Sequence, residues 1–234
     1  KTLEDFLQTD ISDRDLGKLY LSIFCAHCIA NEKLKFVHGD FHAGNIMIKT
    51  LKRPVTVKYR VMGRDIIINT KYIPTIIDFG FSYIEYEGKS YSRIDGDVII
   101  MRFHPDALYG NHPGIDIYKL ITHSMGSLII TNKMSQDKAN FFKKLLEAVA
   151  PGFSGRDQAN MALLVNNPGL GARLLGDTFY YPIDMPDHSY VRLLSFLSQY
   201  RDTKEITQPP KCGDIITEIF GVPGAPHAPC NGEN

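Results

Sequence analysis

The sequence predicts an α+β fold that is mainly helical and carries a small β-hairpin. Apolar residues recur at helical spacing through residues 16–31, which predicts a buried helix. Apolar and polar residues alternate on both sides of a Met-Gly-Arg turn at 62–64, which predicts the hairpin. With 234 residues, of which 44% are apolar, the chain can bury a substantial core. We therefore expect one domain over residues 1–220, followed by a flexible tail at 221–234.

The N-terminal part is expected to be helical. Residues 2–8 place three apolar side chains on one face of a short helical turn. Ser12 is followed three residues later by Asp15, a spacing typical of a capped helix N-terminus. The pattern predicts a long helix that opens at Ser12 and runs to about residue 31.

Two of the four cysteines, Cys25 and Cys28, have the C-x-x-C spacing that occurs in zinc and redox sites. They lie inside the predicted long helix, and the other two cysteines, at 212 and 230, are far away in sequence. A zinc ribbon needs a second pair at short range. We therefore interpret Cys25 and Cys28 as reduced cysteines of the core.

Two polar motifs follow this helix. Residues 37–45 read Val-His-Gly-Asp-Phe-His-Ala-Gly-Asn, and residues 77–80 read Ile-Asp-Phe-Gly. The first motif places Asp40 and Asn45 five residues apart, and the second supplies Asp78. Carboxylate and amide oxygens are ligands that magnesium takes, and a carboxylate can orient a hydroxyl group. The spacing His-x-Asp-x-x-x-x-Asn, followed by Asp-Phe-Gly, predicts a phosphoryl-transfer site.

The two motifs are separated by 32 residues (46–77), which contain the predicted hairpin. Residues 46–48 and 75–78 are expected as short strands on either side of it. Pro74 is expected to interrupt the connection to the second of these strands. We interpret the hairpin as a solvated surface feature rather than a binding element, because such loops vary widely.

The second half of the chain is expected to be helical after a polar loop. Residues 81–114 contain several Gly and Pro residues and predict that loop. Asp116 stands at the start of the next helix, where an acidic side chain is favourable. Further amphipathic helices are expected at 137–149, 157–166, 188–200 and 213–220.

With these motifs, the chain resembles the C-terminal lobe of the protein-kinase-like superfamily over roughly residues 1–130. The 32-residue insert at 46–77 is similar to the extended hairpin of serine/threonine kinases encoded by large cytoplasmic DNA viruses. The stretch His-Gly-Asp-Phe-His-Ala-Gly-Asn at 38–45 also resembles the catalytic loop of aminoglycoside and choline phosphotransferases.

The resemblance implies an ATP-dependent phosphotransferase, in the first instance a serine/threonine protein kinase, that moves the γ-phosphate of ATP to a hydroxyl. It implies that Asp40 is the catalytic base and that Asn45 and Asp78 hold magnesium. It also implies that residues 81–114 take the place of an activation segment. The residues implied to support the shape of the site are His38, His42, Phe79, Gly80 and Asp116.

The chain also departs from the protein-kinase pattern. Gly39 stands where many regulated kinases carry Arg, so the loop itself offers no cation for an activation-segment phosphate. An Ala-Pro-Glu motif is missing, and Phe-His-Pro-Asp at 103–106 replaces it only loosely. The 37 residues before His38 contain no glycine-rich loop and no strand lysine. We expect the N-terminal lobe to be supplied in cis or by another chain.

Composition excludes some partners. Twenty-six basic and 26 acidic residues cancel, so the charge does not favour nucleic acid. The chain has no run of 18 apolar residues, so a membrane span is not expected. The expected partners are ATP and a protein substrate, and the viral resemblance implies a cytoplasmic location, in the infected host cell or the virion. Two alternatives stay open, namely a small-molecule kinase of the aminoglycoside or choline type and a non-catalytic kinase-like scaffold or structural component.

Overall fold

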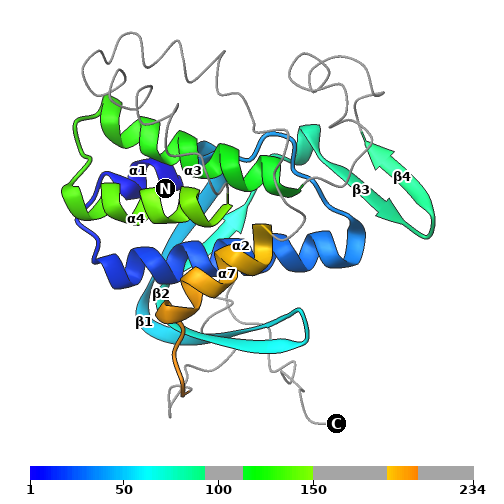
Figure 1. Ribbon diagram of the computed structural model, residues 1–234, viewed down its shortest axis with the longest axis horizontal. Coiled ribbons are helices and arrows are strands. Elements are labelled where there is room, and N and C mark those ends of the chain that lie inside the picture. Colours follow the sequence, from blue (N-terminus) through cyan, green and yellow to red (C-terminus); the bar gives the residue numbers. More distant parts are fainter. Residues whose placement is uncertain (93–112, 150–188, 205–234) are drawn as a thin grey trace.

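The computed structural model describes residues 1–92, 113–149 and 189–204, and this part of the chain has an α+β fold. The helices are α1 (Leu3–Leu7), α2 (Asp13–Leu34), α3 (Pro113–Ile130), α4 (Gln136–Val149) and α7 (Ser189–Leu197), with short 3₁₀ turns η1 (Ala43–Asn45), η2 (Phe79–Phe81) and η5 (Ser198–Tyr200). The strands are β1 (Ile46–Val61), β2 (Arg64–Ile76), β3 (Tyr83–Tyr86) and β4 (Lys89–Ser92), which form two separate antiparallel pairs. In Figure 1, α2 runs the width of the molecule below α3 and α4, and the β3–β4 pair projects from one side.

The two N-terminal helices begin where the sequence predicts. The Ser12 hydroxyl accepts a hydrogen bond from the Asp15 N–H at 3.1 Å and caps α2. Thr2 caps α1 in the same way through the Asp5 N–H. The helix α2 continues three residues beyond the predicted end and stops at Lys35, which has left-handed backbone dihedrals.

The core is centred on α2. The Tyr20 ring is fully buried and packs edge-on against Phe141 and Phe142 of α4, with ring centroids 5.6 Å and 5.4 Å away. Cys25 and Cys28 are free and buried on the same helix, as predicted. Burial raises the pKa of each thiol to about 12, so both stay protonated near neutral pH.

The insert between the two motifs is one continuous hairpin. Strands β1 and β2 pair from Ile46 with Ile76 to Val61 with Arg64, with one register shift after Thr50. The short strands expected at 46–48 and 75–78 are therefore present, except for residues 77 and 78, but as the ends of the two hairpin strands and not as separate elements. Pro74 does not break the chain, since it pairs within the ladder; a two-stranded ribbon has only edge strands, which tolerate proline.

The interpretation of this hairpin as a solvated surface feature is also wrong. Val61, Ile66 and Ile68 are at most 8% exposed and belong to the core cluster that includes α2. The alternation that predicts the strands therefore marks one face packed on the core. Burial of these side chains fixes the hairpin against α2.

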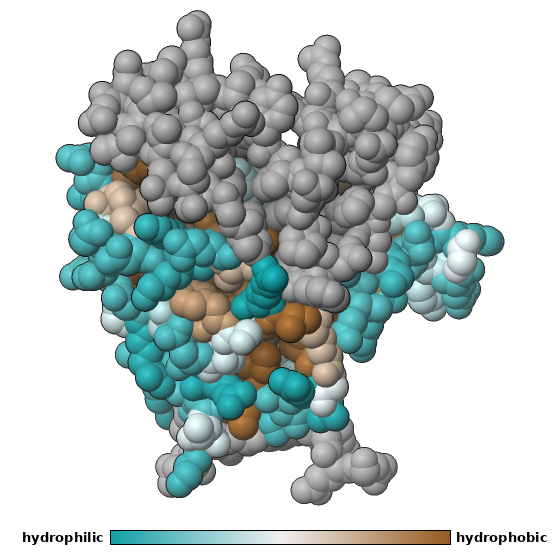
Figure 2. Space-filling view, in the orientation of Figure 1, coloured by the Kyte–Doolittle hydropathy of each residue, from teal (hydrophilic) through white to brown (hydrophobic). Residues whose placement is uncertain are grey.

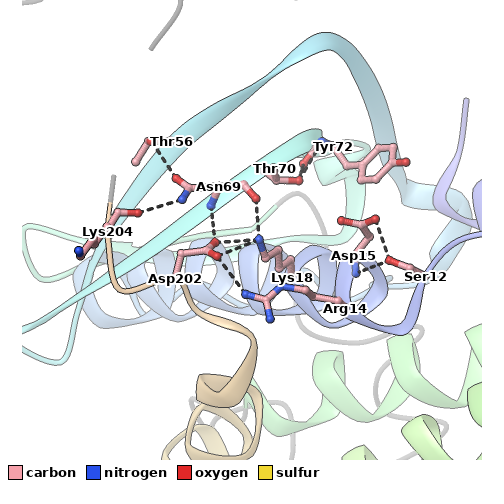
Figure 3. A network of polar contacts seen from close by, with 10 residues as sticks. All are labelled: Ser12, Arg14, Asp15, Lys18, Thr56, Asn69, Thr70, Tyr72, Asp202 and Lys204. Atoms are coloured by element: carbon pink, nitrogen blue, oxygen red, sulfur yellow. Dashed lines mark hydrogen bonds and ion pairs between the residues drawn. The ribbon is translucent and has the colours of Figure 1, made fainter. Parts of the chain in front are cut away.

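A polar network also fastens the hairpin (Figure 3). The ammonium of Lys18 donates to the Asn69 carbonyl at 2.8 Å and lies 2.8 Å from a carboxylate oxygen of Asp202. Asp202 also accepts the Asn69 N–H at 2.7 Å and binds the Arg14 guanidinium at 3.1 Å. Burial raises the pKa of Asp202, but the hydrogen bonds from Lys18 and Asn69 outweigh it, and the pKa lies below its ordinary value. The network joins α2, β2 and the segment after η5.

The segment that follows the second motif is partly a hairpin. Strands β3 and β4 pair around Glu87 and Gly88, both of which have positive φ. This geometry is typical of a two-residue hairpin turn, and glutamate is unusual in it. The expected loop is therefore wrong for residues 83–92.

Several predicted elements lie outside the described residues: residues 93–112 of the predicted loop, the helices at 157–166 and 213–220, and the tail at 221–234. On the face shown in Figure 2, apolar residues gather in the region of α7, with hydrophilic residues around them. Within the described ranges, none of the helices has both the length and the apolar character needed to cross a bilayer.

Candidate functional site

The polar loop at 37–45 is tied at both ends to the segment that carries Asp78. Val37 and Tyr83 exchange two backbone hydrogen bonds, of 3.0 Å and 2.8 Å. At the other end, the Ile77 N–H donates to the Asn45 carbonyl at 3.0 Å. The two motifs, which the hairpin separates in sequence, therefore meet in space.

Gly39 has a structural reason to be glycine. Its φ is +77°, in the left-handed region that side chains rarely adopt. A Cβ atom at this position would lie 2.4 Å from the Phe81 carbonyl oxygen. Arginine, which many regulated kinases carry here, therefore does not fit this loop.

Asp116 of α3 fixes the start of the loop. Its side chain is fully buried, and its two oxygens accept the backbone N–H groups of His38 at 2.5 Å and Gly39 at 3.0 Å. The oxygen bonded to His38 also lies 2.9 Å from His27 Nε2, and since a carboxylate accepts, that nitrogen carries the hydrogen. His27 Nδ1 in turn lies 2.5 Å from the Tyr190 hydroxyl. Asp116 therefore holds two consecutive backbone N–H groups of the loop in place.

His38 lies beneath the loop, as expected of a supporting residue. Its Nε2 is 2.9 Å from the Ile77 carbonyl, so Nε2 carries a hydrogen, and its Nδ1 accepts the Asp40 N–H at 3.3 Å. Both contacts suit a neutral imidazole. Burial lowers the pKa of His38, which favours the same neutral form.

Three side chains contact the carboxylate of Asp40. Asn45 Nδ2 donates to one oxygen at 3.2 Å and to the Asp40 carbonyl at 2.9 Å. His42 Nε2 lies 3.4 Å from the same oxygen, while His42 Nδ1 accepts the Gly44 N–H at 3.1 Å. The ammonium of Lys119, from α3, binds the other oxygen.

These contacts set the charge of Asp40. The hydrogen bond from His42, followed by the contact with Lys119, outweighs partial burial and holds the pKa of Asp40 well below its ordinary value of 3.8. Asp40 is therefore ionised throughout the neutral range. Such a carboxylate accepts hydrogen bonds well, although it is a weak base.

The predicted magnesium ligands are Asn45, which contacts the Asp40 carboxylate, and Asp78, which follows a residue bonded to Asn45. Asn45 is 8% exposed and uses Nδ2 to reach Asp40. Asp78 is exposed, has a positive φ of 62°, and follows Ile77, whose N–H is bonded to Asn45. Hard oxygen donors suit magnesium, which commonly keeps waters and substrate phosphates as its other ligands.

The described ranges contain no group of three or more His, Cys, Asp or Glu side chains that could hold a metal.

Phe79 and Gly80 form the turn after Asp78. Both Phe79 and Gly80 belong to η2. The Gly80 N–H donates weakly to Asp78 Oδ1, at 3.4 Å. The Phe79 ring is 56% exposed, and its centroid lies 5.6 Å from that of His38. The turn thus rests on the histidine that supports the loop.

Two further side chains at the loop, Lys119 and His123, lie outside both sequence motifs. Lys119 lies one helical turn after Asp116, so the spacing alone places the two on one face of α3. The His123 ring stacks on His42, with centroids 4.8 Å apart. Because Asp116 contacts the loop, residues three and seven positions later on the same helix are expected to lie near the loop as well.

Comparison with known proteins gives a distant relationship. No family model matches the chain. A protein of Invertebrate iridescent virus 3 named Probable kinase 098L is 27% identical over 169 residues, which are 71% of this chain and 29% of that protein. Uncharacterized protein 035R of the same virus is 25% identical over 147 residues, 59% of this chain and 12% of that protein.

A third relative comes from an animal. Uncharacterized protein ZK177.2 of Caenorhabditis elegans is 47% identical over 57 residues, 24% of this chain and 19% of that protein. The chain thus spans less than a third of the length of each of these relatives. The similarity supports a distant kinase-like relationship that includes viral proteins.

Proposed function

We propose that the chain is the C-terminal lobe of an ATP-dependent phosphotransferase that acts on a hydroxyl group, as serine/threonine protein kinases do. The observation that supports the proposal is the meeting of the two motifs: Asp40 and Asn45 are in direct contact, and a backbone hydrogen bond joins Asn45 to Ile77, the residue before Asp78. The similarity to a viral protein named as a probable kinase supports the same activity.

In this proposal Asp40 is the residue that faces the acceptor. The acceptor oxygen forms a bond to the γ-phosphorus, the bond from that phosphorus to the β,γ-bridging oxygen breaks, and ADP leaves. Asp40 accepts the hydrogen bond of the acceptor hydroxyl and takes its proton as the new P–O bond forms. Because the pKa of Asp40 is lowered, its main contribution is orientation of the hydroxyl, and proton transfer comes late.

Asn45 and Asp78 would hold magnesium through their oxygen atoms. A bound magnesium ion supplies neutralisation of phosphate charge. His38, His42 and Asp116 hold the loop in the shape that presents Asp40 and Asn45, and Phe79 and Gly80 form the turn that carries Asp78. The N-terminal lobe, in cis or from another chain, would cover the nucleotide.

A small-molecule kinase is the second candidate, and the contact between His42 and Asp40 favours it, because the His-Gly-Asp-x-His pattern is shared with such enzymes. Aminoglycosides and choline are cationic, however, and the ammonium of Lys119 already neutralises Asp40. The pairing therefore supports an uncharged or anionic acceptor, such as a serine or threonine of a protein.

Calorimetric titration of Mg-ATP into the full-length protein tests the proposal. Asp78→Ala is expected to weaken magnesium-dependent binding at least about tenfold, since loss of even an outer partner of a metal ligand costs about 10–100-fold. Asp65→Ala is the matched control, because Asp65 is an exposed carboxylate at the far end of the hairpin, paired with Arg60.

The proposal predicts magnesium-dependent transfer of phosphate to a protein hydroxyl, with Asp40→Asn inactive. Binding of Mg-ATP that Asp78→Ala leaves unchanged would contradict the assigned metal ligands. Absence of Mg-ATP binding in the full-length protein would favour a kinase-like scaffold instead.

A further inference from the structure

Two residues of helix α3 contact the loop. Asp116 binds the loop backbone, and Lys119, one turn later on the same face, binds the Asp40 carboxylate. The two contacts differ in burial: Asp116 is fully buried, whereas the Lys119 side chain is 41% exposed. The first contact is suited to fixing the fold, and the second is partly exposed to solvent.

We propose that Lys119 is a catalytic residue, whose ammonium group binds the phosphoryl group during its transfer to the acceptor that Asp40 orients. This inference rests on the proposed phosphotransferase activity and adds to it a residue that the two motifs do not contain.

The contacts around Asp40 support this role for Lys119. One carboxylate oxygen of Asp40 is occupied by Asn45 and His42, which belong to the loop itself. The oxygen bound by Lys119 is the one toward α3. An acceptor hydroxyl oriented by Asp40 and a phosphoryl group approaching that hydroxyl therefore both come within reach of the ammonium.

The pair can also open at low cost. A half-exposed lysine–carboxylate pair contributes little to stability, so a phosphate oxygen can replace the carboxylate as the partner of the lysine. Lysine carries its charge on a flexible four-carbon stem, which allows the ammonium to follow the phosphoryl group from donor to acceptor.

The chemistry needs such a cation. In the loose transition state, negative charge is spread over the three equatorial oxygens of the phosphoryl group while the bond to the acceptor oxygen forms and the bond to ADP breaks. The loop at 37–45 contains neither Lys nor Arg. A positive group held beside Asp40 stabilises that charge where it develops.

The substitutions Lys119→Ala and Lys119→Arg test the proposal in the full-length protein, with Lys144→Ala, an exposed lysine of α4, as the matched control. Lys119→Ala is expected to lower kcat by about 10²–10³, the effect of removing one transition-state donor, with little change in the KM for ATP. Lys119→Arg is expected to restore much of the rate, and Lys144→Ala to leave it unchanged.

A second measurement does not depend on turnover. MgADP with aluminium fluoride mimics the transferring phosphoryl group, and calorimetry is expected to show its affinity falling in Lys119→Ala by a factor similar to the loss of kcat, while that of MgATP changes little.

Two failures are distinguishable. If the wild type transfers phosphate and Lys119→Ala keeps its kcat and its affinity for the aluminium fluoride complex, the role of Lys119 is overturned and the proposed function stands. The role of Lys119 is also overturned if Lys119→Arg is as inactive as Lys119→Ala. If the wild type neither binds Mg-ATP nor transfers phosphate, the proposed function fails, and the role of Lys119 fails with it.

Discussion

At the scale of single residues, the loop is held by residues that each satisfy more than one structural requirement. Gly39 combines a positive φ with a carbonyl oxygen in the place of a side chain, so only glycine fits. Asp116 satisfies two backbone N–H groups and one imidazole in a fully buried position. A buried carboxylate is costly unless all its oxygens are bonded, and here they are.

Removal of the Asp116 carboxylate is expected to destabilise the protein. Asp116→Ala leaves the His38 and Gly39 N–H groups and the His27 ring without their partner, at a cost of about 3–5 kcal/mol in the free energy of unfolding. Asp116→Asn keeps one acceptor oxygen and is expected to cost less. Urea denaturation of the two variants checks the order, and equal losses would contradict it.

At the scale of elements, the hairpin and α2 behave as one unit. Buried side chains of β1 and β2 pack on α2, and the Lys18–Asp202 pair joins that face to the segment after η5 (Figure 3). Lys18 is 7% exposed, whereas the Arg14 side chain, which also binds Asp202, is 62% exposed. Burial decides which of the two contacts contributes to stability.

The two basic residues are therefore expected to differ. Lys18→Met keeps the volume but leaves Asp202 and the Asn69 carbonyl short of a donor, and should lower the free energy of unfolding by about 2–4 kcal/mol. Arg14→Ala should lower it by less than about 1 kcal/mol. Denaturant midpoints of the two variants measure the difference; similar midpoints would show that the network does not hold the hairpin.

At the scale of the whole molecule, one hydrophobic core spans the described helices and the hairpin, with α2 at its centre. Folding lowers the pKa of several groups in this structure. Hydrogen bonds and ion pairs lower the pKa of Asp40 and Asp202, and burial lowers the pKa of His38 and His123. All four bind protons more weakly in the folded state than in the unfolded state. Stability therefore depends on pH.

We expect the free energy of unfolding to fall as the pH is lowered. For His38 and His123, whose folded pKa lies below the unfolded value of 6.5, the loss begins near pH 6.5, where the unfolded chain gains protons first. Asp40 and Asp202 contribute their full stabilisation above the unfolded pKa of 3.8. That contribution is lost as the pH falls toward their lower pKa values in the folded state. Urea titrations from pH 8 to pH 3 measure the curve. His123→Gln should flatten it between pH 6.5 and 5, and an unchanged slope would contradict the role of that ring.

Much of the local structure could be predicted because its causes are local. The Ser12 cap, the apolar period of α2 and the alternation in the hairpin each depend on neighbours within a few residues, and all three are found as expected. The helix at 137–149 begins one residue earlier than predicted. The β3–β4 hairpin differs from the expected loop, because Glu87 is an uncommon turn residue and gives no turn signal. The packing of the long hairpin on the core is not predictable from its alternation, which does not say what covers the apolar face.

The sequence by itself determined which residues could do the chemistry: the spacing of Asp40 and Asn45, and Asp78 before Phe-Gly, are properties of the chain. Only the tertiary structure decided which side chains surround them. Lys119 meets Asp40 across 79 residues, and Lys18 meets Asp202 across 184. No local pattern records such pairs, because they form only when the core brings distant helices and strands together and burial makes their bonds necessary.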